Sequence, residues 1–551
     1  MSKLLDTRDA KVKYIRRTLI AELAGSMELR AKVVIVGAGI GGLTSAALLA
    51  ARGCEVTVIE KEDAVGGKAR SVMVDGQPIA AGPTVFTMRD VFDDIFRACG
   101  AELSDYIEMQ RAQVLARHAW STDERLDLFD DPARSEAAIG DFAGAKAASG
   151  YREFRAQAKR VYEVLDKTMM RAPKPATPLS LVSRIGITKW SDLRAGRPYE
   201  SLWNVLGEHF PDPRLRQLFG RYATYCGSSP FAASATLMLI AHVEAMGVWL
   251  IKGGISALAD ALQKLAERHG AQFRLGEPVA RIERNWRKVT GVTLASGELI
   301  AADAVIVNAD PTALADGLLG QGVRKTVRPV RHKERSLSAY VWMAHAQTSG
   351  FDLSHHNVFF SGDYPAEFAD IASGKPPTSP SVYICAQDRA ASIDARASAR
   401  ERLQIIVNAP ANGDASGDTH AGTPEEIDQC TKAMEATLAH CGLMLEQERP
   451  QVLTTPSDFA RLFPSTGGAL YGRDSHGWAA PFRRQGPRAK IRGLYCTGGA
   501  THPGAGVPMA ALSGQLAARM VIVDHVLTRR FHPAAMPGGM SMRSAPTAST
   551  A

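Results

Sequence analysis

The glycines in the run Gly37-Ala-Gly39-Ile-Gly41-Gly42 are the residues whose types and spacing most clearly suggest chemistry. An apolar run, residues 33–36, precedes them, and a helical apolar pattern follows over residues 43–51. A second β-branched run, residues 56–59, ends on Glu60, 18 residues after Gly42. This order of strand, tight turn, helix, strand and acid is typical of a dinucleotide-binding βαβ unit.

Each part of the run has a physical role toward a dinucleotide. Gly37 makes the turn, Gly39 lets the backbone approach the pyrophosphate, and Gly42 lets helix and strand pack closely. The start of the helix directs free N–H groups and its positive dipole end at the phosphates. Glu60 is expected to accept hydrogen bonds from two ribose hydroxyls. An acid at this position disfavours a 2′-phosphate, so NADP is not expected.

The next ten residues distinguish between the two remaining dinucleotides. They carry Gly66-Gly67-Lys68-Ala69-Arg70, a second glycine pair followed by basic residues. Such a backbone suits the far side of a flavin's pyrophosphate and its ribityl chain. The pattern, which begins at Glu60-Lys61, resembles the flavoproteins of the amine oxidase and phytoene desaturase superfamily, and the resemblance implies FAD rather than NAD.

A second glycine-rich signature lies near the other end of the chain. Residues 493–514 read GLYCTGGATHPGAGVPMAALSG, which predicts a strand, a glycine loop and a helix that begins near Pro508. Alone, the loop is also consistent with a simple chain reversal. The residues predicted to contact FAD from both ends are Gly37, Gly39, Gly42, Glu60, Lys61, Gly66, Gly67, Lys68, Arg70, Val279, Gly498, Gly499, Pro508 and Met509.

The run Thr501-His-Pro-Gly-Ala-Gly-Val-Pro508 resembles the C-terminal signature of bacterial-type carotenoid desaturases. Residues 221–230 (RYATYCGSSP) agree, and the resemblance covers most of residues 31–530. Within that family, residues 247–254 and 355–368 are similar to the 1-hydroxycarotenoid 3,4-desaturases. The chain departs from the family at Ala80, where Asp is frequent, and at Ala500, where the superfamily often has Asp.

The resemblance implies an FAD-dependent desaturase of a C40 carotenoid, acting at C-3,4 of 1-hydroxy- or 1-methoxy-carotenoids such as 1-hydroxyneurosporene. The close alternative is a phytoene desaturase or another isoprenoid oxidoreductase of the same fold. A non-catalytic flavin protein that binds polyenes is a second class. An amine oxidase is a third, although Cys496 lies before the glycines rather than where those enzymes attach their flavin.

Desaturation removes a hydride from one carbon and a proton from its neighbour, so the protein needs an apolar tunnel and a base. His242 and Glu244 are the first candidates for the base, because they interrupt the most apolar stretch of the chain; a buried structural pair is the alternative. His355, His356 and His502 are weaker candidates. No metal site is predicted. Quinone or oxygen is expected to reoxidise the flavin.

The order of these segments predicts an α/β protein with a discontinuous Rossmann-like FAD-binding domain, formed by residues 31–115, 250–315 and 485–530. A mixed helix and strand substrate domain, with a helical insert, fills the gaps at 116–249 and 316–484. Residues 1–30 are predicted to be a basic leader, disordered or lying on a membrane, and residues 531–551 a disordered tail.

Composition limits the partners. The 551 residues carry a formal net charge of +8, yet no basic run stands beside interleaved aromatics, so nucleic acid is not expected. An anionic membrane surface suits both the charge and a lipophilic substrate. His242 and Glu244 interrupt the most apolar stretch, residues 233–251, so no uninterrupted apolar run reaches the ~18 residues of a membrane span; this predicts a cytoplasmic protein attached peripherally. The seven scattered cysteines are expected to be buried free thiols.

Overall fold

Two β-sheets form the framework of the protein in a computed structural model that describes residues 29–186, 196–390, 399–415 and 422–531. The first is a five-stranded parallel sheet in the order β21-β13-β1-β2-β9. Its strands are β1 (Lys32–Val36), β2 (Glu55–Ile59), β9 (Gln272–Arg274), β13 (Ala304–Val307) and β21 (Leu494–Cys496). Segments far apart in sequence therefore meet in one sheet, and the predicted α/β class is confirmed.

Both faces of this sheet are covered, as parallel strands require. Val33 and Ile35 face a cluster of helices, whereas Val34 and Val36 face a small antiparallel sheet. The helices are α2 (Ile40–Ala50), α3 (Arg89–Ala98), α11 (Ile255–Arg268) and α17 (Val507–Phe531). The opposite layer contains β10 (Val279–Arg284), β11 (Val289–Leu294), β12 (Leu299–Ala301) and α12 (Pro311–Asp316).

The second sheet has seven strands in the order β20-β14-β18-β17-β16-β6-β7, antiparallel except between β16 and β6. Its bounds are β6 (Val114–Ala119), β7 (Arg125–Phe129), β14 (Ser338–Ala346), β16 (His356–Phe359), β17 (Val382–Ala386), β18 (Glu401–Ala409) and β20 (Gln451–Thr454). Leu403, Ile405 and Val407 pack on the side of α14 (Pro424–His440). The alternate residues Gln404, Ile406 and Asn408 therefore face the other way.

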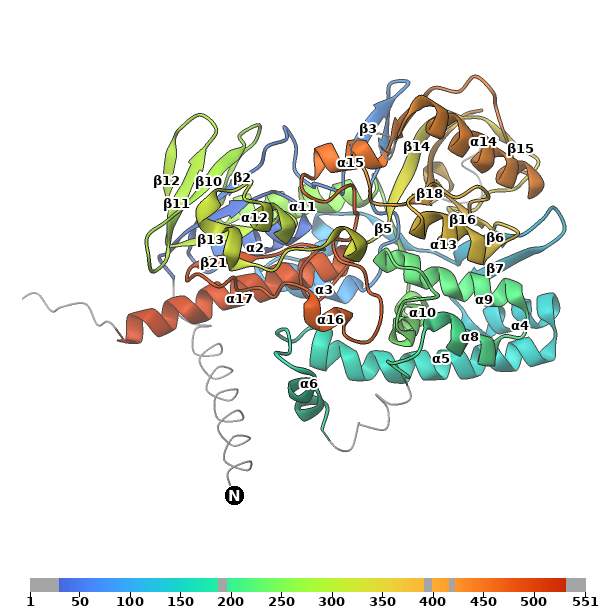
Figure 1. Cartoon of the computed structure of the whole chain (residues 1–551), viewed down its shortest axis with the longest axis horizontal. Helices are drawn as coiled ribbons and strands as arrows, with labels where there is room; N and C mark the ends of the chain where they lie inside the picture. Colours follow the sequence, from blue (N-terminus) through green and yellow to red (C-terminus); the bar gives the residue numbers. More distant parts are fainter. Residues whose placement is uncertain (1–28, 187–195, 391–398, 416–421, 532–551) are drawn as a thin grey trace, which may run out of the picture.

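A helical layer lies beside this second sheet, at the lower right of Figure 1. It contains α4 (Pro132–Ala143), α5 (Ala145–Leu165), α6 (Pro178–Ile185), α8 (Leu202–His209), α9 (Pro213–Gly220) and α10 (Leu239–Ala245). Asp131, Thr177 and Asp212 accept backbone N–H bonds at the starts of α4, α6 and α9, and each is followed by proline at the first helical position. Sequence therefore fixes where these helices begin.

The remaining elements connect these layers. They are β3 (Ser71–Val74), β4 (Gln77–Ala80), β5 (Met109–Arg111), β8 (Trp249–Ile251), β15 (Thr348–Ser349), β19 (Met444–Leu445), α13 (Tyr364–Ala372), α15 (Pro456–Leu462) and α16 (Ala480–Arg483). Short 3₁₀ turns cover Leu103–Asp105, Arg221–Cys226, Ala235–Met238, Gln321–Thr326, His332–Glu334 and Gln387–Ala390, and a π turn covers Asp166–Met170.

The apolar stretch at residues 233–251 is not one long helix. It divides into a 3₁₀ turn, α10 and β8, because Gly247 adopts φ +135° and β8 pairs with β5. By length and composition, one described helix qualifies as a membrane span, Val507–Leu527 with a mean hydropathy of 1.2. It is 61% buried inside the protein and packs along α2, as a core helix does.

All seven cysteines are free and six are buried, as predicted. The predicted leader and tail lie almost entirely outside the described residues, apart from residues 29, 30 and 531. The domain boundaries given above stay a prediction.

Candidate active site

A cavity of about 1080 Å³ is lined both by the glycine turn after β1 and by the inner face of the seven-stranded sheet. Cofactor and ligand pockets in proteins usually measure ~300–1,000 Å³, so this cavity stands at the upper end of that range. Of the residues predicted to contact a dinucleotide, those that line it are Gly37, Gly39, Glu60, Lys61, Gly66, Gly67, Lys68, Arg70, Val279, Gly498, Gly499, Pro508 and Met509. Gly42 is not among the lining residues.

The first glycine turn is closed to any side chain. Gly37 has φ +100°, a conformation that L-residues avoid. A Cβ on Gly39 would lie 2.8 Å from Asn308 Nδ2, and one on Gly42 only 2.3 Å from the Gly37 carbonyl oxygen. Gly42 thus acts by letting α2 pack against the turn. Gly39, Ile40 and Gly41 at the start of α2 line the cavity, so this helix end is a candidate anion site.

Glu60 stands at the carboxyl end of β2, buried but lining the cavity. Its Oε2 accepts the Ala38 N–H at 2.7 Å, and its Oε1 accepts the Glu62 N–H at 3.1 Å. These bonds hold the carboxylate in place. Because each carboxylate oxygen has two lone pairs, Glu60 retains acceptor capacity for hydroxyl groups of a ligand.

The two glycine signatures meet where α2 crosses α17. A Cβ on Gly514 would lie 2.4 Å from the Gly41 carbonyl oxygen, and Ser45 Oγ bonds the carbonyls of both Gly41 and Gly514. From α17, Ser513 Oγ accepts the Gly498 N–H at 2.7 Å. Small residues on both helices therefore bring the C-terminal loop against the N-terminal turn.

Two residues at the end of β13 also belong to this site, although the sequence alone did not single them out. Asn308 Nδ2 donates to the Gly37 carbonyl at 3.2 Å, and Asp310 caps α12. Both line the cavity. The available signal was their position, since polar residues at the carboxyl end of a parallel strand face the ligand crevice.

Lys68 is a half-buried cation in the cavity wall. Burial lowers the pKa of its ammonium group to about 8, and the charge of Asp310 partly opposes this shift. Its Nζ donates to the Leu470 carbonyl and lies 5.1 Å from the ring centroid of Phe463. A cation held here complements an anionic or electron-rich ligand.

Glu244 lines the cavity within a buried polar cluster. Tyr222 donates to its Oε2 at 2.7 Å and Tyr225 to its Oε1 at 2.9 Å. Arg221, itself buried, donates to the Tyr225 hydroxyl at 2.9 Å. Burial raises the pKa of Glu244, whereas Arg221 and the two tyrosines lower it. Arg221, Tyr222 and Tyr225 come from the RYATYC turn and Glu244 comes from α10, so the fold brings together two segments that are separate in the sequence.

His242 does not share this position. It is not among the cavity-lining residues, and its ring packs on Tyr162 with centroids 5.0 Å apart. Burial and Lys159 lower its pKa. Residues two apart on a helix point to different sides, so α10 directs Glu244 into the cavity and His242 toward α5.

The other predicted histidines are hydrogen-bonded inside the protein. His502 bonds the Ala172 carbonyl at 2.9 Å, which joins the C-terminal loop to the helical layer. His356 Nδ1 lies 2.7 Å from the Tyr383 hydroxyl, and His355 Nε2 lies 3.4 Å from Cys385 Sγ. Burial lowers the pKa of His502 and of His355 to about 4. None of the three lines the cavity.

A comparison with known protein families identifies one family that matches most of this chain. The family described as flavin containing amine oxidoreductase matches residues 40–522. This chain belongs to that family. A flavin is therefore its cofactor, and the chain is an oxidoreductase.

Curated relatives span nearly the whole chain. A hydroxyneurosporene desaturase from Rubrivivax gelatinosus is 48% identical over 94% of this chain and 98% of its own length. A second protein of that name, from Cereibacter sphaeroides, is 43% identical over 90% and 98%. A phytoene dehydrogenase from Streptomyces griseus is 31% identical over 92% and 98%.

Solved structures share the fold at low sequence identity. A putrescine oxidase with bound putrescine superimposes with a TM-score of 0.56 at 15% identity, over 91% of this chain and 99% of its own. A cyclohexylamine oxidase from Brevibacterium oxydans gives 0.52 at 16%, over 91% and 100%. These likenesses place the chain in the amine oxidase fold.

Proposed function

We propose that this flavoprotein is an FAD-dependent carotenoid desaturase that introduces the C-3,4 double bond into 1-hydroxy- or 1-methoxy-carotenoids such as 1-hydroxyneurosporene. The observation that carries the proposal is the single cavity that joins the dinucleotide turn to apolar walls, including Val341, Val358 and Ile406 of the second sheet. The named relatives give the substrate class.

The residues around the glycine turn fit FAD. The pyrophosphate would lie at the start of α2, where side chains on Gly39 and Gly41 would clash with Asn308, and the ribose at Glu60. Gly66 and Gly67, both at positive φ, and Lys68 would border the other half of the cofactor. Gly498, Gly499 and the start of α17 would close the site from the C-terminal side.

Bound FAD supplies a hydride acceptor for the C–H bond that breaks. The protein's own contribution is to exclude water, to hold the polyene rod and to take up the proton from the neighbouring carbon. Glu244 is the proposed base, because its carboxylate lines the cavity and the Tyr222 and Tyr225 hydroxyls fix both of its oxygens. Quinone or oxygen is the proposed electron acceptor.

Co-expression with enzymes that supply one carotenoid at a time tests the reaction. With 1-hydroxyneurosporene, we expect the absorption spectrum to shift to longer wavelength by one conjugated double bond, while phytoene stays colourless. Colour from phytoene would instead identify a phytoene desaturase. If neither carotenoid changes while the purified protein still holds FAD, the substrate class is wrong, and bleaching by amines would then indicate an amine oxidase.

We also propose that the rim of the cavity docks on an anionic membrane, from which the carotenoid enters. Large apolar side chains are exposed there: Leu179 of α6 by 79%, Tyr199 by 76% and Trp478 by 44%. Tyr199 and Trp478 line the cavity, and their ring centroids are 5.6 Å apart. An exposed apolar rim at the mouth of an apolar cavity favours contact with lipid.

Basic side chains accompany this rim. Arg483 is exposed next to the cavity-lining Phe482, and the pKa of Lys174 is lowered by burial and by the nearby charges of Arg328 and Arg473. Among the described residues, Lys174, Arg328 and Arg483 form no ion pair. Such cations are expected to contribute ~1 kcal/mol each near an anionic surface.

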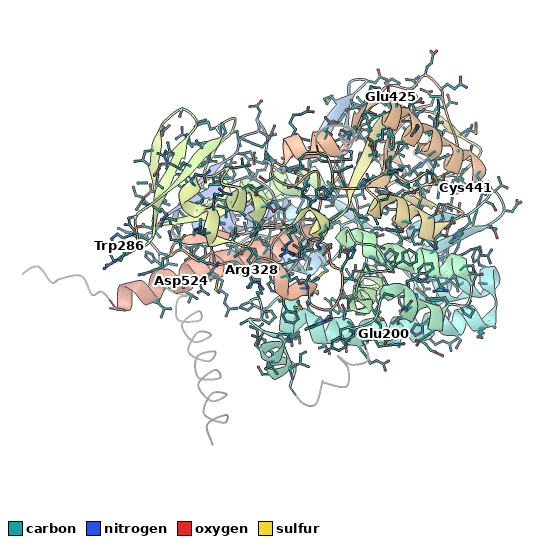
Figure 2. The ribbon with its side chains drawn as sticks, in the orientation of Figure 1. Glu200, Trp286, Arg328, Glu425, Cys441 and Asp524 are labelled. Carbon is teal, nitrogen blue, oxygen red and sulfur yellow. The ribbon has the colours of Figure 1, made fainter. Side chains whose placement is uncertain are left out.

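Vesicle flotation measures this docking. We expect the protein to float with phosphatidylglycerol-rich vesicles more than with phosphatidylcholine vesicles, and Leu179→Asp combined with Trp478→Ser to weaken binding about tenfold. Trp286→Ser is the matched control, because Trp286 is 79% exposed at the far end of the molecule in Figure 2. Equal loss in the control variant, or equal binding to both vesicles, would contradict the proposed surface.

A further inference from the structure

Gln404 on β18 presents an unused hydrogen-bond acceptor in the cavity wall. Its side chain is buried, with 1% of its surface exposed, and lines the cavity. Its Nε2 donates to the Gly82 carbonyl at 2.9 Å, whereas its Oε1 has no partner within the described part of the chain. Only the amide nitrogen can donate to a carbonyl, so this bond fixes the orientation of the group and leaves Oε1 as the free end.

Polar neighbours surround Gln404 on this wall of the cavity, beside apolar residues of the same face. Gln404 pairs with Cys385 in the sheet, and Tyr383, two residues before Cys385, is its diagonal neighbour. The Tyr383 hydroxyl lies 2.6 Å from Thr84 Oγ1 and 2.7 Å from His356 Nδ1. On the same cavity wall stand the apolar Ile406, Val341 and Val358.

An unmet buried acceptor is unfavourable, and a ligand that donates a hydrogen bond relieves it. A carotenoid hydrocarbon has no donor, and a 1-methoxy end has an oxygen without a hydrogen. A 1-hydroxy end carries one O–H donor. The C-1 oxygen is also only three bonds from C-3, so a hydrogen bond to this hydroxyl would position the C-3,4 bond that reacts.

We propose that Gln404 Oε1 accepts a hydrogen bond from the 1-hydroxyl group of the substrate, and that this contact makes the enzyme prefer 1-hydroxy- over 1-methoxy-carotenoids. Gln404 is thus a positioning and specificity residue rather than a catalytic one. The inference rests on the proposed function, because it takes the hydroxylated carotenoid as the substrate.

The test compares kcat/KM for 1-hydroxyneurosporene and 1-methoxyneurosporene, presented in the same detergent, with the flavin-loaded enzyme. For the unaltered protein, we expect kcat/KM to favour the hydroxy substrate by about 10- to 100-fold. Gln404→Met keeps the side-chain volume but removes the acceptor, so this ratio is expected to fall to about one. The loss is expected to fall on the hydroxy substrate alone.

Gln387→Met is the matched control. Gln387 holds the neighbouring Ala80 through both of its amide atoms, at 2.8 and 3.0 Å, and does not line the cavity. We expect this variant to keep the hydroxy preference even if it is less stable. The measurement on the unaltered protein needs no variant, so the proposal remains testable if Gln404→Met fails to fold.

Three results would overturn the inference. One is an unaltered enzyme that uses both substrates equally. Another is a Gln404→Met variant that retains the preference, or that loses both substrates equally while it still holds flavin. In these cases the desaturase function stands and only the role of Gln404 falls. The third is an unaltered, flavin-loaded enzyme that desaturates neither substrate, which overturns the proposed function together with the inference.

Discussion

Gly42→Ala is expected to yield a protein that no longer retains flavin on purification. The added Cβ would lie 2.3 Å from the Gly37 carbonyl oxygen, a backbone atom that cannot rotate away. The start of α2 must then move, and its N–H groups lose their alignment on the pyrophosphate. We expect affinity for FAD to fall at least about tenfold, ~1.4 kcal/mol, measured by titration of the apoprotein with FAD.

Thermal unfolding with and without added FAD gives a second measurement. For the unaltered protein, FAD at about 100 times its Kd is expected to stabilise the fold by ~2.7 kcal/mol, and Gly42→Ala is expected to lose most of that gain. Gly140→Ala in α4 is the control, because its added Cβ meets nothing closer than Ala148 at 3.5 Å. A Gly42→Ala protein with a full complement of flavin would contradict the prediction.

Glu244→Gln is expected to lower kcat for desaturation by about 10²–10⁴-fold while flavin stays bound. The amide keeps the shape of the carboxylate but cannot take up a proton. The matched control is His242→Gln, two residues away on α10, whose ring packs on Tyr162 outside the cavity. We expect kcat of this control to stay within about twofold of the unaltered enzyme. Equal losses in the two variants would contradict the role of Glu244.

The pH profile gives the same assignment an independent measurement. Burial raises the pKa of Glu244, and a base acts in its ionised form, so activity is expected to fall as the pH drops through a value above the usual glutamate range. Tyr222→Phe and Tyr225→Phe each remove a hydrogen bond that favours the ionised form. We expect each to move this acid limb to higher pH. An acid limb that persists in Glu244→Gln would assign it to another group.

The local glycine pattern predicted strand, turn and helix correctly because those preferences are short-range. A tight turn at Gly37 and close packing at Gly42 require glycine wherever the chain goes next. The prediction that the cysteines are buried free thiols was also correct for six of the seven, because unpaired thiols pack as small apolar groups in the core. The division of the apolar stretch 233–251 did not follow from spacing, because β8 pairs with β5 across about 140 residues of sequence.

The sequence by itself determined the flavin signature, its family and the residue types that border the dinucleotide, because these depend on local backbone geometry. Tertiary structure decided which polar groups face the substrate space. It turned Glu244 inward and His242 outward on one helix, linked Arg221 to Glu244 through the Tyr225 hydroxyl, and left Gln404 with a free acceptor. The physical reason is that orientation and burial depend on packing between segments distant in the chain, which spacing alone does not encode.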